Sequence, residues 1–138
     1  MTIRKTLVTR MVGHMLMLSE TSETPTDHEW DAFLKVLVAN RAHFATLRIL
    51  VMTEGGGPTA GQRKRLEMAL GGQSVKVAVV TDSIKVRFIV SSVALLNHSI
   101  STFSRSEFAK AVAFLGLAPQ EHRVAIRLID EMAKELIE

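Results

Sequence analysis

The sequence has no cysteine among its 138 residues. Disulfides, thiolate nucleophiles and cysteine-ligated zinc are therefore excluded, and this absence is typical of a reducing compartment. Long apolar runs are lacking too, because the longest, residues 84–96, is too short to span a membrane and carries Lys85 and Arg87. No small-residue cleavage site follows the basic N-terminal segment, as a signal peptide would require. We expect a cytoplasmic protein without a membrane partner.

Recognisable catalytic and metal-binding motifs are also missing. None of the five histidines is paired with another at helical spacing or placed in a zinc motif. No G-x-S-x-G elbow is present, and Ser91 and Ser92 lie in an apolar segment without an evident base. Glu54 and Asp82 each follow a predicted strand and could meet for acid–base work, although capping and solvated roles are commoner. We expect no enzyme, no metal and no cofactor.

What is present is the composition of one soluble globular domain. Apolar residues make up 47% and charged residues 22% of the chain, and 138 residues suffice for a sizeable core. The net charge is only +3, and Arg63–Arg65 is the one tight basic cluster. Specific nucleic-acid binding usually needs a broader basic surface, so we expect no such partner.

Periodicity along the chain predicts alternating strands and helices. Two extended segments, 3–12 and 14–19, flank Gly13 as a β-hairpin, and a polar segment, 20–27, follows. Helices are expected at 26–41, 59–70, 84–96, 104–115 and 119–138, and further strands at 47–52, 75–80 and 100–103. The order ββαβαβαβαα predicts an α/β fold with a single, mostly parallel sheet. We expect one domain over 1–138, with a core at 3–117 and an extra C-terminal helix at 119–138.

Three helix starts carry the spacing of a capping box, in which a Ser or Thr and a Glu or Gln three residues later cap each other's backbone. The pairs are Thr26 with Glu29, Thr59 with Gln62, and Ser104 with Glu107. The helix at 84–96 is different, because it is apolar nearly all round. The C-terminal helix, a second copy of the chain or a lipid could cover it. Phe88 and Ile89 mark it as a candidate homodimer interface.

The segment 51-VMTEGGGPTAGQRKR-65 places three glycines between a strand and a basic helix, an arrangement that can bind phosphate. A Walker A loop is excluded, since Gln62 and Arg63 stand where Lys and Ser or Thr are required. A dinucleotide fingerprint fits Gly55, Gly57 and Ala60 in spacing, but the pattern alone is weak and the following proline removes a donor N–H.

Three interpretations of this loop stay open. It could simply turn the chain, because glycine accepts positive φ at little cost. It could be a partner-binding loop at the carboxyl edge of the sheet, where ligands of open α/β sheets tend to bind. It could also belong to a nucleotide-binding module, in which Thr59, Arg63 and Lys64 meet phosphates and Asp82 meets a ribose.

Residues 47–117 resemble the bacterial STAS-like proteins, relatives of anti-sigma factor antagonists that are grouped with lipid-binding CRAL-TRIO-like folds. The shared features are P-T-x-x-Q-R at 58–63, V-A-V-V-T-D-S at 77–83, and a helix that ends in A-x-x-F-L-G-L at 111–117. The resemblance implies a STAS-like fold and a non-enzymatic regulatory module that binds another protein. A small apolar-ligand or lipid carrier is the third functional hypothesis, based on the helix at 84–96 and this grouping.

In the antagonists, a serine in the loop M-D-S-S-G is phosphorylated. The alignment implied by the resemblance sets Met52 on the methionine, Thr53 on the aspartate and Glu54 on that serine. Glu54 would then carry a fixed negative charge, or Thr53 would be a displaced phosphosite. The implied partner-binding surface comprises Thr53, Glu54, Gly55, Gly56, Gly57, Thr81, Asp82 and Ser83.

Overall fold

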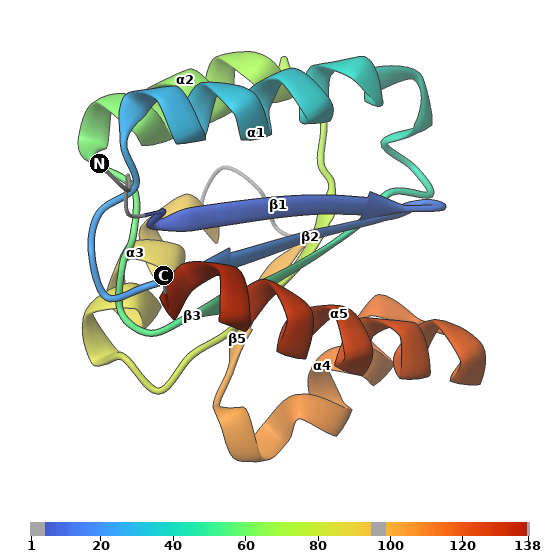
Figure 1. Ribbon diagram of the computed structural model, residues 1–138. Coiled ribbons are helices and arrows are strands. Elements are labelled where there is room, and N and C mark those ends of the chain that lie inside the picture. The colour runs from blue at the N-terminus through green and yellow to red at the C-terminus, as the bar shows by residue number, and fades with distance from the viewer. Residues whose placement is uncertain (1–4, 95–98, 138) are drawn as a thin grey trace.

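The computed structural model describes residues 5–94 and 99–137 and has an α/β architecture (Figure 1). One five-stranded sheet runs in the order β1-β2-β3-β4-β5. β1 is antiparallel to β2, and the other neighbouring pairs are parallel, which confirms the predicted α/β class and mostly parallel sheet. The strands are β1 Leu7–Val12, β2 Met15–Glu20, β3 Arg48–Thr53, β4 Lys76–Val80 and β5 Ile100–Phe103.

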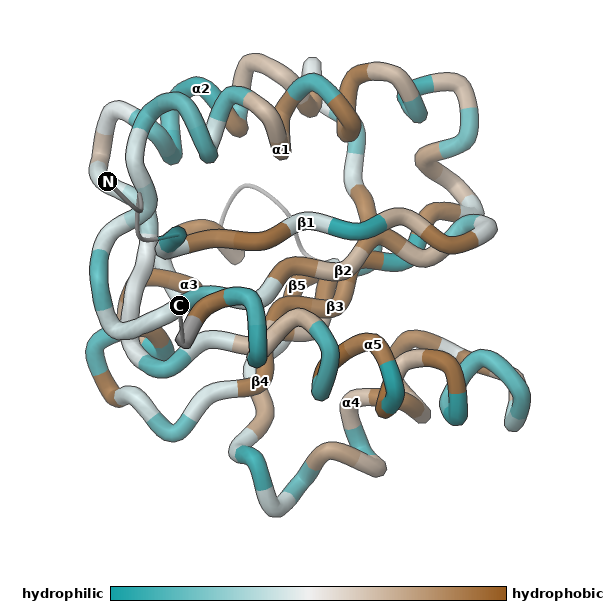
Figure 2. Tube along the Cα trace, viewed as in Figure 1, coloured by the Kyte–Doolittle hydropathy of each residue, from teal (hydrophilic) through white to brown (hydrophobic). Residues whose placement is uncertain are grey.

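Helices cover both faces of the sheet. They are α1 Asp27–Ala39, α2 Ala60–Leu70, α3 Ile84–Ala94, α4 Phe108–Leu115 and α5 Pro119–Ile137, with 3₁₀ turns at Arg41–His43 and Arg105–Glu107. Core packing places α1, α2 and α3 on one face and α4 and α5 on the other. The strands between these layers are coloured largely as hydrophobic in Figure 2.

Alternation along the parallel strands sorts side chains between the two layers. On β2, Leu16 and Leu18 enter the core beneath α1 and α2, whereas Met15 and Met17 enter the core against α4 and α5. Successive residues of a strand point to opposite faces, and helices on both faces bury both sets. All six residues of β2 are therefore buried.

Several predicted boundaries shift. The second strand was predicted to end at residue 19, but it continues to Glu20, so the polar connection starts one residue later. The first helix stops at Ala39 instead of Arg41, because the chain tightens there into a 3₁₀ turn. The predicted helix at 84–96 is confirmed to Ala94, and its last two residues lie outside the described ranges.

The three predicted capping boxes are confirmed, with both reciprocal bonds formed in each. The Thr26 hydroxyl accepts from the Glu29 N–H at 3.1 Å, and the Thr59 hydroxyl accepts from the Gln62 N–H at 3.1 Å. Each box satisfies backbone donors that a helix start leaves unpaired. These starts place α1 directly after the loop from β2, and α2 directly after the glycine loop.

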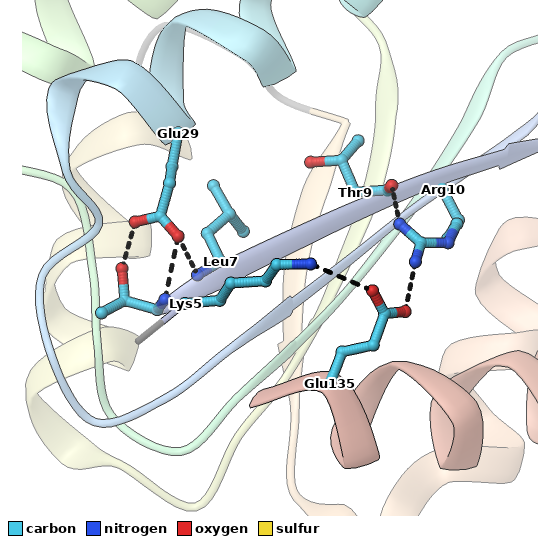
Figure 3. Close-up of polar contacts among 7 residues, drawn as sticks. Lys5, Leu7, Thr9, Arg10, Glu29 and Glu135 are labelled. Atoms are coloured by element: carbon cyan, nitrogen blue, oxygen red, sulfur yellow. Dashed lines mark hydrogen bonds and ion pairs between the residues drawn. The ribbon is translucent and has the colours of Figure 1, made fainter. Parts of the chain in front are cut away.

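Two carboxylates fasten the edge strand β1 to helices on opposite faces (Figure 3). Glu29 of α1 accepts from the backbone N–H groups of Thr6 at 2.8 Å and Leu7 at 3.0 Å, and also from the Thr6 hydroxyl. Glu135 of α5 pairs with Lys5 and Arg10. Burial alone would raise the pKa of Glu29, but the hydrogen bonds outweigh it and lower that pKa to about 2.

Replacing Glu29 tests this attachment. Glu29→Gln keeps the shape but removes the charge and turns an NH₂ group toward backbone donors, so we expect a loss of about 2–3 kcal/mol of unfolding free energy. Urea denaturation measures it. The matched control is Glu131→Gln on α5, whose exposed carboxylate pairs with Arg127 and which should change stability by less than about 0.5 kcal/mol. Equal losses in both variants would contradict the role of Glu29.

Candidate functional site

Three adjacent parallel strands end in a row of buried polar side chains on the face covered by α1, α2 and α3. Glu20 of β2 pairs in register with Thr53 of β3. Because Met52 pairs with Val80, Thr53 is followed across the sheet by Thr81, the residue after β4. The exposed fractions of Glu20, Thr53 and Thr81 are 5%, 2% and 0%. The carboxyl end of the sheet is therefore polar inside the core.

The two threonines of this row satisfy their hydroxyl groups within their own loops. The Thr53 hydroxyl donates to the Gly56 carbonyl at 2.7 Å and accepts from the Gly55 N–H at 3.2 Å. The Thr81 hydroxyl accepts from the Ser83 N–H at 3.0 Å. Both side chains thus stabilise the turns that follow their strands. As a displaced phosphosite, Thr53 would first have to leave these bonds.

Glu20 is the exception in the row. Its Oε2 atom is buried and has no hydrogen-bond partner among the described residues. Burial, followed by repulsion from Glu29, raises the pKa of Glu20 to about 8. The carboxyl group is therefore protonated at neutral pH, because ionisation without a compensating partner is costly in an apolar environment.

Glu20 was predicted to lie in the polar connection 20–27 and was not predicted to be a site residue, but it is the last residue of β2. The signal that could have found it is the alternation Leu16, Leu18, Glu20, which extends one face of β2 by a residue.

A cavity of about 100 Å³ adjoins this row, between the sheet and helices α1, α2 and α3. On this face the core divides into one cluster beneath α1 and α2 and a smaller one beneath α3. The cavity wall is almost wholly apolar. Its members from the sheet are Leu18, Ile49, Val51, Val77, Val79 and Ile100, and those from the helices include Trp30, Phe33, Leu66, Val86, Ile89 and Val90. Of the polar wall residues, Glu20 and Thr53 come from the strand ends and Arg63 comes from α2.

The glycine loop forms part of the cavity wall through Gly56, Gly57 and Pro58. The Gly56 N–H donates to the Thr21 carbonyl at 2.9 Å. A Cβ atom on Gly56 would lie 2.1 Å from the Glu23 carbonyl oxygen, so a side chain there has no room. Gly55 has a φ of 141°, which also favours glycine. The loop therefore packs closely against the segment after β2.

Outside the cavity, the same edge of the sheet carries an exposed charged cluster. Arg105 pairs with the Glu54 carboxylate, and its backbone N–H donates to Asp82 Oδ1 at 3.1 Å. From the sequence, Glu54 and Asp82 could meet at this edge, and the structure brings both to Arg105. Glu54 thus has a cation beside it, at the position where the resemblance places a phosphoserine. Ser83 lies close by, within the Thr81 turn.

The candidate phosphate-binding residues begin α2. The Thr59 hydroxyl is taken by the capping box, and Arg63 donates to the Pro58 carbonyl at 3.0 Å. Lys64 is exposed. The basic cluster also includes Arg65, which pairs with Asp31 of α1. A bound phosphate would have to replace the internal bonds of Thr59 and compete for Arg63.

The apolar helix α3 has two different faces. Val86 and Val90 are buried beneath it, whereas Ile84 and Phe88 are 84% and 76% exposed. Ile89 faces the cavity and lies against Gly57, so it does not share the exposure of Phe88. The suggestion that the C-terminal helix covers α3 was wrong, because α5 packs on the opposite face of the sheet.

Other classes of site are not seen within the described residues. Residues 5–94 and 99–137 contain no cluster of three or more histidine and acidic side chains that could hold a metal ion. In those same ranges no helix has both the length and the apolar character to cross a bilayer. No protein-family model, no curated protein and no solved structure matches the chain.

The tight packing of the glycine loop predicts different tolerances at neighbouring positions. Gly56→Ala should lower the unfolding free energy by about 2 kcal/mol or more, because its Cβ meets backbone carbonyls that cannot rotate away. Gly57→Ala is the matched control, since its Cβ meets only the flexible end of Ile89, at 3.3 Å. Thermal and urea unfolding of both variants test this difference. Equal stability of the two would show that the loop does not pack as described.

The buried carboxyl group predicts a pH-dependent stability. The unfolded chain ionises Glu20 near pH 4.5, and the folded chain does so only near pH 8. Its contribution to the unfolding free energy is therefore present below about pH 4.5 and falls as the pH rises to 8. Glu20→Gln cannot ionise, so its stability relative to wild type should increase by about 2–3 kcal/mol between pH 5 and pH 7.5.

Urea unfolding at several pH values measures this difference. The control is Glu67→Gln, which replaces an exposed carboxylate on α2. A constant difference between Glu20→Gln and wild type across this range would contradict the buried, protonated state.

Proposed function

We propose that this protein binds a small, largely apolar ligand in the cavity between the sheet and helices α1, α2 and α3. The observation that carries the proposal is the pairing of an apolar cavity with a buried carboxyl oxygen that has no partner. Protein interiors are close-packed, and a buried polar group without a partner costs about 1–3 kcal/mol. A ligand that fills the space and bonds to Glu20 offsets both costs.

The size of the cavity limits the ligand. Pockets for drug-sized molecules measure roughly 300–1,000 Å³, whereas an engineered dry cavity of about 150 Å³ accepts benzene. The volume here, about 100 Å³, suits a compact molecule or group of about four to six non-hydrogen atoms. This supports the sequence-based hypothesis of an apolar-ligand carrier, but the ligand would bind at a different place from the one that the sequence suggested. The cavity lies under the inner face of α3, beside Val86, Ile89 and Val90, instead of on its exposed face.

A second candidate function is the regulatory, protein-binding role implied by the STAS-like resemblance. It is favoured by the exposed Glu54–Arg105 pair and Asp82 at the carboxyl edge, and by Ile84 and Phe88 on α3. Exposed charges of this kind steer association, and exposed aromatic side chains commonly anchor interfaces. The homodimer hypothesis uses the same exposed side of α3, through Phe88. Ile89 takes no part in it unless the cavity opens.

The nucleotide-binding hypothesis receives less support from the geometry. Gly56 of the glycine loop packs against the segment 21–23. The Gly56 N–H donates to the Thr21 carbonyl instead of pointing toward an open site. The hydroxyl at the start of α2 is also engaged. Phosphate sites of this type need free backbone N–H groups. We therefore assign the loop to the wall of the apolar cavity.

Occupancy of the cavity can be tested with apolar probes. Xenon and methylenecyclopentane should bind saturably to the wild-type protein, with NMR shift changes confined to residues around the cavity. Val77→Phe adds volume at the cavity wall and should weaken binding at least tenfold, because little space remains for the probe. The matched control is Val12→Phe, which makes the same change at an exposed site on β1 and should bind as wild type does.

Absence of saturable binding to the wild-type protein would overturn the proposed function. Equal binding to Val77→Phe, with the fold intact by NMR, would place the probe elsewhere and overturn it as well.

A further inference from the structure

The chemistry beside the cavity narrows the class of ligand. We propose that Glu20 donates a hydrogen bond, as a neutral carboxylic acid, to a carbonyl oxygen of the bound molecule, so that the site selects a neutral ketone, aldehyde or ester group over an amine or a plain hydrocarbon. This inference rests on the proposed function, since it assumes that the cavity is occupied. It adds the chemical group, a carbonyl, that the ligand presents to Glu20 at the carboxyl edge of the sheet.

The other polar side chains in the cavity wall already have hydrogen-bond partners within the protein. The Thr53 hydroxyl is used by Gly56 and Gly55. The Trp30 indole N–H donates to the Gln62 carbonyl at 2.9 Å, and Arg63 donates to the Pro58 carbonyl. Glu20 Oε2 alone among these side-chain atoms is buried without a partner. A ligand therefore meets one unsatisfied carboxyl group, the internally bonded Thr53 and Arg63, and otherwise apolar side chains.

Ligand groups differ in the number of hydrogen-bond partners that they need when they are buried. An ammonium group has three N–H donors and no acceptor, so it needs several acceptors when it is buried. Of the wall side chains, Glu20 offers the buried oxygen that has no partner among the described residues, and Arg63 adds a like charge at the cavity wall. A carbonyl oxygen needs a single donor, which a protonated carboxyl group supplies. The number of available partners thus matches a carbonyl compound.

The charges around Glu20 also favour its neutral form. Glu29 of α1 has a carboxylate that is held ionised by Thr6, Leu7 and Thr26 and that repels a negative charge on Glu20. From α2, Arg63 lines the cavity, yet no ion pair between Arg63 and Glu20 forms. On the outer side, Glu54 is paired with Arg105. These surroundings keep the proton on Glu20 at neutral pH, and its burial raises its pKa to about 8.

Three probes of nearly equal shape test the inference. Cyclopentanone, methylenecyclopentane and cyclopentylammonium share a five-membered ring and differ at one exocyclic atom. Each has six non-hydrogen atoms, the upper end of the range that the cavity volume suits. Dissociation constants are measured at pH 6 by NMR titration of the full chain, for wild type, Glu20→Leu and Glu20→Gln. Leucine removes the hydrogen-bond donor and puts an apolar side chain of similar size in its place. Glutamine supplies an N–H donor instead of the carboxyl O–H.

The quantity to compare is the ratio of the two affinities, ketone over hydrocarbon, because it cancels the general hydrophobic gain of filling the cavity. The loss of one hydrogen bond should lower this ratio about fivefold in Glu20→Leu relative to wild type. In Glu20→Gln the ratio should stay within about twofold of wild type. Cyclopentylammonium should bind the wild-type protein most weakly of the three.

The outcomes separate this inference from the proposed function. If methylenecyclopentane binds but the ratio does not change in Glu20→Leu, the cavity is a ligand site and the role of Glu20 as donor is overturned. Tighter binding of cyclopentylammonium than of cyclopentanone to the wild-type protein would also overturn it, in favour of an ionised carboxylate. If none of the probes binds, the proposed function fails, and the inference fails with it.

Discussion

The need to satisfy buried polar groups at the carboxyl end of the sheet organises the region around the cavity. The backbone continues the pairing of β2 and β3 past the strands, since the Glu54 N–H donates to the Glu20 carbonyl at 3.1 Å and the Gly56 N–H donates to the Thr21 carbonyl. The Thr53 hydroxyl closes the turn from Thr53 to Gly56 by donating to the Gly56 carbonyl. Each bond pairs a backbone or side-chain donor with an acceptor, and both groups would be costly to leave unpaired. The positions of both loops therefore follow from the strand ends, and within residues 5–94 and 99–137 the Glu20 Oε2 atom is the buried side-chain oxygen that stays without a partner.

The α/β class and the starts of the helices could be predicted from the sequence because their signals are local. A capping box needs two residues three positions apart, and Thr26 with Glu29 forms the same bonds in the fold as the spacing indicates. The burial of Glu20 is different, because it depends on the pairing of β2 with β3, which places Glu20 opposite Thr53, a residue far along the chain. Seen alone, Glu20 resembles the polar residues that follow it. Whether β2 ends at residue 19 or at residue 20 thus decides whether Glu20 is taken for a loop residue or for a buried acid.

The glycine loop shows why spacing alone did not identify the site. Three consecutive glycines look equivalent in a motif, but each meets a different constraint. Gly55 adopts a positive φ, Gly56 has no room for a Cβ beside the Glu23 carbonyl, and Gly57 lies against Ile89. Two of these constraints come from segments about thirty residues away in either direction. A phosphate-binding pattern and a close-packed cavity wall therefore produce the same string of residues.

The two candidate functions use opposite sides of this loop. Thr53, Gly56 and Gly57 line the cavity, whereas Glu54 between them faces outward to Arg105. A ligand that stabilises one arrangement of Gly56 and Gly57 also stabilises the arrangement of Glu54 that goes with it. By thermodynamic linkage, a partner that prefers this arrangement of Glu54 raises the affinity for the ligand by the same factor as the ligand raises the affinity for the partner. The four residues 54–57 join the outward-facing Glu54 to the cavity wall. Ligand binding in the cavity is therefore compatible with a regulatory role for the exposed surface around Glu54.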